Sequence, residues 1–600
     1  MTKTDAPALR RPLGPRVAVF LVVAAIAALP LLPVPEFWIT QADTVGMYAL
    51  VVLGLVLLTG VAGLTSFGQA AFVGLGAYAT AYLTTVHGLS PWIGLAAGLV
   101  LTLAVAAVLA GVTLRMSGHY LPLATIAWGL SLFFLLGNLE FLGKFDGLLG
   151  VPPVTVAGHA LRSGREMYPL IWGTALAGAL ALVHLLDSRP GRAMRALKGG
   201  TLMAEAMGIP TGRYKLQVFL VAALYASVSG WLFAHLQRSV NPSPFGLTMG
   251  IEYLFMAVLG GVGAVGGAFV GAAAVKVAED QLQDWLPRLL HASGPLELVV
   301  FGLVLVAVLQ LAPEGLWSIG ARWRPGRRHD PRLWATAAPL PRAAQPAQGE
   351  TVLQLDAVRR TFGGLVAVND VGFAVRAGEI VALIGPNGAG KSTLFNLVTG
   401  VLPLTAGRVT FRGERVDGRS ARAIACRGMS RTFQHVRMIP DMSVLENVAL
   451  GAHRRAGGGA LRAMLRLDRA SEHRLLAEAW RQLDRIGMAA LANEPAGNLA
   501  LGQQRLLEIA RALCTDPALL LLDEPAAGLR LKEKEALAGV LAQLRAEGMS
   551  LLLVEHDMDF VMTLADRVVV VEFGTRLTEG TPAQVQADPK VRAAYLGVEH

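Results

Sequence analysis

A glycine-rich segment at 385–393 has the residue types and the spacing needed to hold a run of phosphate groups. It follows an apolar stretch at 380–384 and precedes a helical pattern, the setting that such a loop requires. Glycines let backbone N–H groups turn toward phosphate oxygens, and the helix N-terminus adds positive potential. Lys391 would reach the outer phosphates, and Ser392 would offer its hydroxyl to Mg²⁺. The sequence therefore predicts that ATP and Mg²⁺ bind at Gly385, Pro386, Asn387, Gly388, Ala389, Gly390, Lys391, Ser392 and Thr393.

Two adjacent carboxylates end a second apolar run, which extends from Leu519 to Leu522. Asp523 stands 132 residues after Lys391, and Glu524 follows it directly. A carboxylate at a strand end can hold Mg²⁺, and its neighbour can orient or deprotonate a water for in-line attack on a phosphate. We therefore predict Asp523 as a metal ligand and Glu524 as a catalytic base.

The composition divides the chain into two halves that suit different solvents. Of 600 residues, 54% are hydrophobic and only 16% are charged, with a net charge of +10. Residues 1–349 hold 23 Lys and Arg against 15 Asp and Glu, whereas residues 350–600 hold 30 against 28. Soluble domains carry about 25% charged residues, so a single soluble globule is excluded, as is a disordered chain. We predict a membrane half and an aqueous half, and no nucleic-acid partner.

The first half predicts eight to ten membrane spans. From residue 44 to residue 114 there are 71 residues without Asp, Glu, Lys or Arg, whereas one crossing needs about 20 apolar residues. Buried core helices are the alternative, but they would need amphipathic partners that the sequence lacks. A cleaved signal peptide is the alternative for the first segment, and the eight later segments disfavour it. The candidate spans are 17–34, 45–64, 67–86, 91–114, 120–137, 168–186, 216–236, 249–272 and 296–312.

Three basic clusters predict the orientation of the spans. They extend from Lys3 to Arg16, from Arg189 to Lys215 and from Arg322 to Arg342, and short cytoplasmic loops are rich in such residues. If all three clusters lie in the cytoplasm, nine full crossings would place the second half of the chain outside the cell. One of the nine segments must therefore not be a simple crossing. The glycine-rich stretch 246–271 is our choice for a broken or re-entrant segment, with close helix packing through small residues as an equal alternative.

The domain organisation follows from these patterns. We predict a polytopic α-helical membrane domain over 1–321, a linker rich in Arg, Pro, Ala and Gln over 322–349, and an α/β nucleotide-binding domain over 350–600. The two cysteines, Cys426 and Cys514, lie in the second half and provide no disulfide framework, which suits the cytoplasm.

The second half, from about Thr351, resembles the ATP-binding subunit of an ABC transporter. The resemblance rests on the phosphate loop, on Asp523-Glu524, and on the three further segments 431–434, 499–505 and 555–557. It implies that Gln434 senses the γ-phosphate through Mg²⁺, that His556 is the switch histidine, and that an aromatic at Phe362 stacks on adenine. It also implies that the signature residues Gly502 and Gln503 bind the nucleotide of a second ATPase.

Longer segments are similar to one branch of these transporters, the branched-chain amino-acid importers. In the second half these are 434–448, an Arg- and Ala-rich helical insert near 451–490, and 523–528. In the first half, similarity to the membrane subunits of the branch lies in 66–78, 114–121, 191–209 and 259–266. The chain therefore resembles one permease fused to one ATPase.

The sequence departs from the family at two places. The usual Ser and first Gly of the signature are Ala500 and Leu501, which removes one hydroxyl donor to the opposite γ-phosphate. Where the family usually has Asn or Asp followed by Pro, this chain has Arg530 and Leu531, which alters the contact across the ATPase dimer.

The resemblance implies ATP-driven import of branched-chain or related small polar amino acids across the bacterial cytoplasmic membrane. Its implied partners are a periplasmic solute-binding protein, the lipid bilayer, and a second permease and second ATPase, or a second copy of this chain. Residues 189–215 would be the coupling helix that docks on the ATPase near Gln434, or else a loop that only sets topology. The alternatives are a half-transporter exporter, which its short glycine-rich apolar segments disfavour, and a non-transporting membrane regulator.

Overall fold

The computed structural model describes residues 14–114, 116, 120–290, 297–312, 314–321, 330 and 337–596. Its contacts divide the chain into two compact units, which are described separately below. The first contains residues 1–184 and 215–326, and the second contains residues 185–214 and 327–600. Most of the first and third basic clusters, and half of the predicted linker at 322–349, lie outside the described residues.

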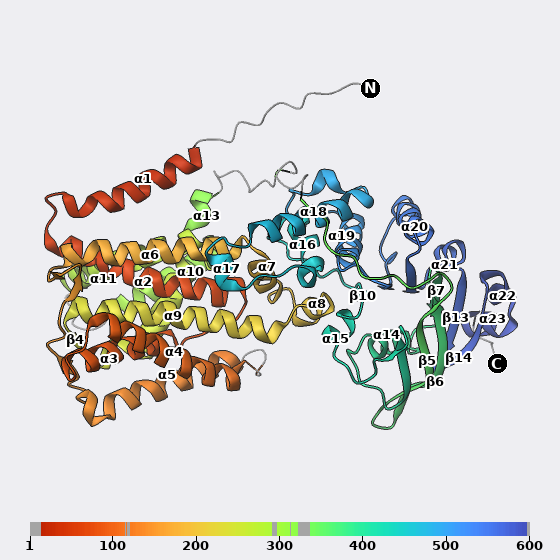
Figure 1. Ribbon diagram of the computed structural model, residues 1–600, viewed down its shortest axis with the longest axis horizontal. Helices are drawn as coiled ribbons and strands as arrows, with labels where there is room; N and C mark the ends of the chain where they lie inside the picture. The colour runs from red at the N-terminus through yellow and green to blue at the C-terminus, as the bar shows by residue number, and fades with distance from the viewer. Residues whose placement is uncertain are drawn as a thin grey trace, which may run out of the picture. The chain divides into compact units, whose positions relative to one another are not determined.

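The first unit is a bundle of apolar helices (Figure 1). Among the described residues, five helices are long and apolar enough to cross a membrane, or six if one bent pair counts as a span. Shorter helices form at three other predicted spans, so the number of crossings stays a prediction. The bundle comprises α1 (Gly14–Ala28), α2 (Glu36–Leu55) with a π-helical turn (Val56–Val61), α3 (Gln69–Thr85), α4 (Pro91–Thr113), α5 (Tyr120–Asn138), α6 (Gly164–Leu186), α9 (Thr211–Gln237), α10 (Leu247–Gly260), α11 (Val265–Leu290), α12 (Glu297–Leu311) and α13 (Leu316–Ala321).

The predicted break in the glycine-rich stretch is confirmed. Helices α10 and α11 form one apolar pair that bends by 119° between Gly260 and Val265. The close-packing alternative is also realised, because a Cβ on Gly271 would collide with the carbonyl of Met256. One on Gly267 would lie 2.7 Å from the carbonyl oxygen of Gly260. The glycines therefore permit both the bend and the near-contact of the two backbones.

Two short antiparallel pairs complete the first unit. Strand β1 (Leu148–Leu149) pairs with β4 (Ser239–Val240), and β2 (Val154–Val156) forms a hairpin with β3 (His159–Leu161). The β1–β4 pair joins the connection after α5 to the connection after α9, which are distant in the sequence.

The second unit is built on a predominantly parallel six-stranded sheet with the order β10-β11-β12-β7-β13-β14. Only β14 runs antiparallel to its neighbour. A four-stranded antiparallel sheet with the order β6-β5-β8-β9 lies beside it in the sequence and in space. The strands are β5 (Thr351–Phe362), β6 (Leu365–Arg376), β7 (Ile380–Ile384), β8 (Ala406–Phe411), β9 (Glu414–Arg415), β10 (Met429–Arg431), β11 (Leu519–Asp523), β12 (Ser550–Val554), β13 (Arg567–Glu572) and β14 (Thr575–Gly580).

The central strand β7 is buried on both faces, as parallel strands require. Ile380, Ala382 and Ile384 face one apolar core, and the alternate residues Val381 and Leu383 face the other. The helices around the sheets are α14 (Lys391–Val398), α15 (Ala421–Ala425), α16 (Val444–Ala449), α17 (Ala460–Met464), α18 (Arg469–Arg485), α19 (Leu501–Leu513), α20 (Leu531–Ala546), α21 (Met558–Leu564), α22 (Pro582–Ala587) and α23 (Pro589–Leu596).

Two helices from the middle of the first half belong to the second unit. They are α7 (Arg189–Ala196) and α8 (Thr201–Ala206), which lie within the segment 185–214. Ser188 caps α7 by accepting a hydrogen bond from the Gly191 N–H. The fold of the second unit therefore includes a piece of chain that the sequence places between two membrane spans.

Candidate functional site

The glycine-rich loop joins β7 to α14, as predicted from the sequence. Lys391 begins α14, and its ammonium donates to the carbonyl oxygens of Gly385 at 2.6 Å and Pro386 at 2.9 Å. Burial lowers the pKa of Lys391, and the nearby carboxylate of Glu524 opposes that shift. Gly390 has a φ of +93°, and a Cβ there would collide with the Ala367 carbonyl, so only glycine suits the position. The loop therefore presents a cation and free backbone N–H groups at a helix N-terminus, which suits phosphates.

The structure brings three predicted catalytic residues together at the end of β11. Glu524 follows the strand, and its Oε1 lies 2.6 Å from Nε2 of His556. Its Oε2 accepts a hydrogen bond of 2.8 Å from Nε2 of Gln434. The backbone of Glu524 has a φ of +49°, a conformation that non-glycine residues rarely adopt. Both carboxylate oxygens are thus oriented from opposite sides, which is the arrangement expected of a positioned base.

Asp523 lies beside this carboxylate and pairs with a buried arginine that the sequence analysis did not assign to the site. Nη2 of Arg431 lies 3.3 Å from Oδ2 of Asp523, and Nη1 donates to Asn396 and Thr399 of the α14 region at 2.9 and 2.7 Å. Burial raises the pKa of Asp523, Arg431 lowers it, and Glu524 raises it further. Arg431 therefore ties the phosphate-loop helix to the end of β11.

Glu555 is a second residue that sequence reasoning missed. Its Oε1 accepts a hydrogen bond of 2.6 Å from the Ala526 N–H, and its Oε2 accepts one of 3.0 Å from the His556 N–H. Burial is the main cause of the rise in its pKa. Glu555 holds the turn after Glu524 against the histidine. A carboxylate directly after the apolar strand β12 was the sequence feature that could have identified Glu555 as a site residue.

The donor chemistry near the loop fits Mg²⁺. Ser392 is exposed at the start of α14, and its hydroxyl, the Gln434 amide and the Asp523 carboxylate are the hard oxygen donors that Mg²⁺ prefers. Among the described residues, no group of three or more His, Cys, Asp or Glu side chains could hold a metal ion alone. A site with one carboxylate matches the general use of Mg²⁺ with nucleotides, where phosphates supply further ligands.

The remaining predicted site residues are Gly502, Gln503 and Phe362. Gln503 accepts a hydrogen bond of 3.1 Å from the Ala500 N–H in the first turn of α19, and a Cβ on Gly502 would lie 2.9 Å from Oε1 of Glu533. Phe362 ends β5 and is 41% exposed, with the guanidinium of Arg360 lying 4.5 Å from its ring centroid. Their roles toward a nucleotide stay predictions.

The segment 185–214 is anchored to the nucleotide-binding domain by a buried ion pair. Nη1 of Arg192 contacts Oε1 of Glu472 on α18, and both side chains are only 3% exposed. The other oxygen of Glu472 accepts a hydrogen bond of 3.1 Å from the Arg189 backbone N–H. One carboxylate therefore binds both a charged side chain and the first turn of α7.

His453 lies buried beneath the same segment. Its Nε2 lies 3.5 Å from Nη1 of Arg189 and 3.3 Å from the Tyr214 hydroxyl, and its carbonyl accepts a hydrogen bond of 2.7 Å from Arg189. A guanidinium can only donate, so Nε2 acts as an acceptor and the imidazole is neutral. Burial, followed by the cations Arg189, Arg192 and Arg422, holds the pKa of His453 well below its usual value.

Helix α8 lies close to the arginine that contacts Asp523. Leu202 and Ala206 of α8 line a small hollow together with Thr399 and Arg431. On the neighbouring helix α15, Nε of Arg422 donates to the Gly208 carbonyl at 3.2 Å. The segment 185–214 is therefore connected through packed side chains to the phosphate-loop helix and to the end of β11.

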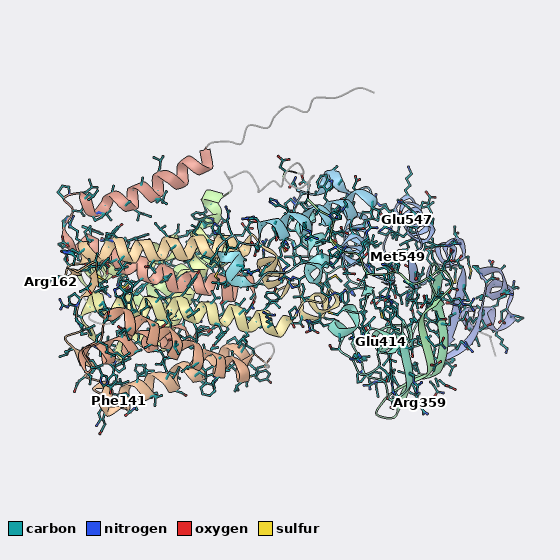
Figure 2. The ribbon with its side chains drawn as sticks, in the orientation of Figure 1. Phe141, Arg162, Arg359, Glu414, Glu547 and Met549 are labelled. Atoms are coloured by element: carbon teal, nitrogen blue, oxygen red, sulfur yellow. The ribbon has the colours of Figure 1, made fainter. Side chains whose placement is uncertain are left out.

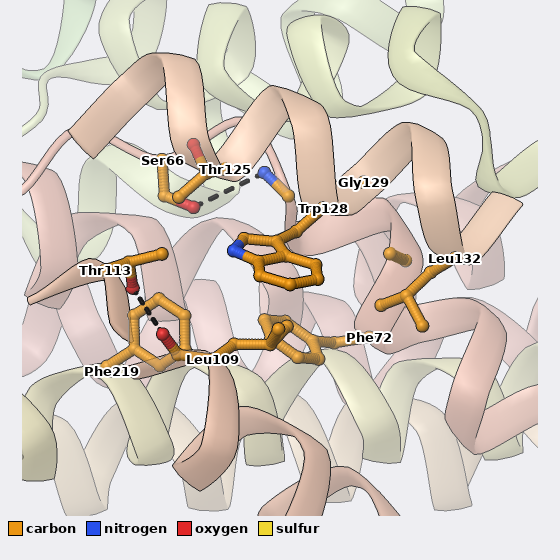
Figure 3. Close-up of a pocket in the computed structure, with 11 residues that line it drawn as sticks. Ser66, Phe72, Leu109, Thr113, Thr125, Trp128, Gly129, Leu132 and Phe219 are labelled. Atoms are coloured by element: carbon orange, nitrogen blue, oxygen red, sulfur yellow. Dashed lines mark hydrogen bonds between the residues drawn. The ribbon is translucent and has the colours of Figure 1, made fainter. Parts of the chain in front are cut away.

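The membrane unit contains a separate pocket among α3, α4, α5 and α9, shown in Figure 3. It is small and partly open to the surroundings, and its lining is aromatic and aliphatic with a few small hydroxyl groups. Trp128 and Phe72 line it, as do Ser66 and Thr125. Among the described residues that line it, none carries a charged side chain.

The fold and the site define an ABC-type ATPase domain in one chain with a polytopic helical domain. Three family models match: "Branched-chain amino acid transport system / permease component" over residues 39–309, "ABC transporter" over 368–527, and "Branched-chain amino acid ATP-binding cassette transporter" over 575–600. The chain belongs to the branched-chain amino-acid family of ABC transporters, with a permease and an ATPase in a single polypeptide. The exporter alternative has no support among these matches.

Curated relatives cover the second half. The chain is 44% identical over 251 residues to the high-affinity branched-chain amino acid transport ATP-binding protein LivG of Salmonella typhimurium, a match that spans 41% of this chain and 98% of that protein. It is 42% identical over 249 residues to BraF of Pseudomonas aeruginosa, again 41% of this chain and 98% of the relative. A crystal structure of a nucleotide-free ATP-binding cassette from an ABC transporter is 31% identical, with a TM-score of 0.37, and the match covers 41% of this chain and 100% of that one.

Removing one partner of the buried ion pair should strongly destabilise the second unit. Glu472→Gln leaves the Arg192 guanidinium buried without a counter-charge, which costs about 3–5 kcal/mol of unfolding free energy. Thermal unfolding of the full chain measures the loss. Glu547→Gln is the matched control (Figure 2), because the Arg485–Glu547 pair is far more exposed and should cost less than about 1 kcal/mol. Equal shifts for the two variants would contradict the assignment.

Acidification should destabilise the second unit through His453. Its folded-state pKa lies below the unfolded value of about 6.5, so below that pH the unfolded chain binds a proton that the folded chain does not. The unfolding free energy should therefore fall by up to about 1.4 kcal/mol per pH unit. Thermal unfolding between pH 7.5 and 5.5 measures the change. His453→Asn should remove this part of the pH dependence of the unfolding free energy, and His87→Asn, at an exposed position, should leave it in place. An unchanged pH dependence in His453→Asn would refute the role of His453.

Proposed function

We propose that this chain is an ATP-driven importer of branched-chain amino acids, or of related small polar amino acids, in the bacterial cytoplasmic membrane. The observation that carries the proposal is the Glu524 carboxylate, held between His556 and Gln434 beside the phosphate loop. The relatives LivG and BraF are named as branched-chain amino acid transport proteins, which supports the same solute class.

The residues of the site have different roles in ATP hydrolysis. Backbone N–H groups of the loop and Lys391 hold the phosphates, and Phe362 stacks on adenine. Ser392, Gln434 and Asp523 would hold Mg²⁺, which neutralises charge on the phosphates when bound. Glu524 accepts a proton from the attacking water, and His556 fixes the carboxylate in position.

A complete site requires a second ATPase. Gly502 and Gln503 stand in the segment that resembles the family's signature, so we propose that they complete the nucleotide site of a partner. The partner is either a second copy of this chain or a separate permease and ATPase. With Ala500 at the signature serine position, one side-chain donor is absent, and backbone groups at the start of α19 serve instead.

The segment with α7 and α8 is proposed to couple hydrolysis to transport. It lies on the domain that contains the site, and α8 contacts the hollow lined by Thr399 and Arg431. Closure of the ATPase pair would move Arg431 with the end of β11, and α8 with it. The motion would alternate access to the solute path, and a periplasmic solute-binding protein would deliver the solute.

Replacing the proposed base should separate binding from turnover. Glu524→Gln keeps the size and shape of the side chain but replaces one acceptor oxygen by an NH2 group and cannot accept the proton, so hydrolysis should fall by about 10²–10⁴-fold. ATP should still bind, and uptake of leucine, isoleucine and valine should stop. Both rates are measured with the full chain and its cognate binding protein in vesicles.

Glu535→Gln, at an exposed position of α20, should behave as wild type and is the matched control. Wild-type uptake by Glu524→Gln would overturn Glu524 as the base. An active wild-type ATPase without uptake of any of the three amino acids would overturn the solute class.

A further inference from the structure

A short segment of the ATPase domain exposes three leucines that nothing in the described chain covers. Leu461 lies on α17, and Leu465 and Leu467 follow it directly before α18. They are 71%, 61% and 70% exposed, respectively. Neighbouring large apolar side chains in water are unfavourable, and such groups mark contact surfaces. We call residues 459–468 the leucine segment.

Arginines are interleaved with these leucines. Arg462 and Arg466 are both exposed, and Arg469 follows at the start of α18, against one acidic residue, Asp468, within the segment. Exposed leucines with alternating arginines are the composition of a chain that lies in a membrane interface, where arginine attracts anionic headgroups. A dry protein interface would instead be depleted in such charge at its centre.

Two contacts tie both ends of the leucine segment to the end of a membrane span. Before it, the Gly458 carbonyl accepts a hydrogen bond from Arg189. After it, Nη2 of Arg469 lies 3.2 Å from Oδ2 of Asp187. Asp187 is the residue directly after Leu186, the last of α6. All four partners belong to the same compact unit.

The length of α6 places these contacts at the membrane boundary. Its 23 residues span roughly 34 Å at 1.5 Å per residue, slightly more than the ~30 Å hydrocarbon layer. Asp187 and Arg189 follow within three residues, at most about 11 Å of extended chain. The adjoining headgroup layer is about 5–7 Å thick, so the leucine segment is held within reach of it.

We propose that the leucine segment lies in the headgroup layer of the cytoplasmic leaflet, with Leu461, Leu465 and Leu467 inserted and Arg462 and Arg466 on anionic lipid phosphates. The ATPase domain thereby contacts the bilayer directly, in addition to its covalent link to the permease. The surface fits a bilayer better than a protein for two reasons. Its apolar and cationic groups alternate, and the residues that flank it on both sides contact Asp187 and Arg189, which follow the end of α6.

A site-directed fluorophore tests this placement in the intact chain. Leu465→Cys is labelled with an environment-sensitive dye in a Cys426→Ser background, where the remaining Cys514 is fully buried. The chain is reconstituted in vesicles of neutral lipid with or without anionic lipid, and quenchers are placed either in the acyl chains or in the water. Glu414→Cys, with a 65% exposed side chain at the start of β9, is the matched control (Figure 2).

The dye at 465 should be quenched from the acyl chains and protected from the aqueous quencher, and the dye at 414 should show the reverse. Replacing Arg462 or Arg466 with Gln should lower the inserted-to-free ratio about fivefold per arginine in anionic vesicles, and little in neutral ones. Aqueous quenching at 465 equal to that at 414 would overturn the proposal. Protection from water without quenching from the lipid would also overturn it, because that result indicates a protein partner.

Leu461→Cys provides an independent second site if the label at 465 impairs folding. ATP hydrolysis equal to that of the unlabelled chain establishes that either labelled protein is folded. The same reversal of quenching is expected at 461, and its absence in a chain that hydrolyses ATP counts against the proposal.

Discussion

The buried pair of Arg192 and Glu472 is the interaction on which the rest of the account depends. Removing two charges from water costs several kcal/mol each, so such a pair persists only where geometry and further hydrogen bonds compensate. Here Glu472 also accepts the Arg189 N–H, and Arg189 itself reaches the carbonyls of His453 and Gly458. His453 stays neutral beneath these cations, because burial and the charges of Arg189 and Arg192 hold its pKa well below the usual value. The segment between two membrane spans is thereby fixed to the ATPase domain by directed contacts, in addition to buried apolar side chains such as Met194, Met203 and Ile209.

From this anchor a connected set of side chains leads to the phosphates. Helix α8 adjoins Arg431, which bonds the α14 region and Asp523, and Glu524 follows with its two oriented oxygens. A displacement of β11 relative to α14 would therefore change the surroundings of α8. The connection gives the proposed coupling a physical route, in which nucleotide state is communicated by packed and hydrogen-bonded groups within one compact unit.

Local sequence patterns predicted most of the fold, but they could not predict contacts between segments that are distant in the sequence. The phosphate loop was evident because all its functional residues lie within nine consecutive positions. The bend in 246–271 could be predicted because the stretch is rich in glycine and because the number of spans required one segment that does not cross fully. Arg431 was visible in the sequence only as part of a motif, since its partners Asn396 and Asp523 lie 35 and 92 residues away. Glu472 and His453 could not be assigned at all, because their partners in the first half of the chain lie 239 to 280 residues earlier. The domain bounds stay predictions, because half of the linker lies outside the described residues. The adenine contact of Phe362 and the signature contacts of Gly502 and Gln503 stay predictions because they concern a nucleotide or a second chain.

The number of ATP molecules hydrolysed per amino acid imported, measured in vesicles, tests the central claim most directly. The reversal Arg192→Glu should raise this ratio by weakening the anchor while the Lys391–Glu524 site still hydrolyses ATP. The double reversal Arg192→Glu with Glu472→Arg should return the ratio toward the wild-type value, since it restores the pair in the opposite sense. An unchanged ratio in the single variant, with uptake and hydrolysis falling together, would contradict a role for this ion pair in coupling.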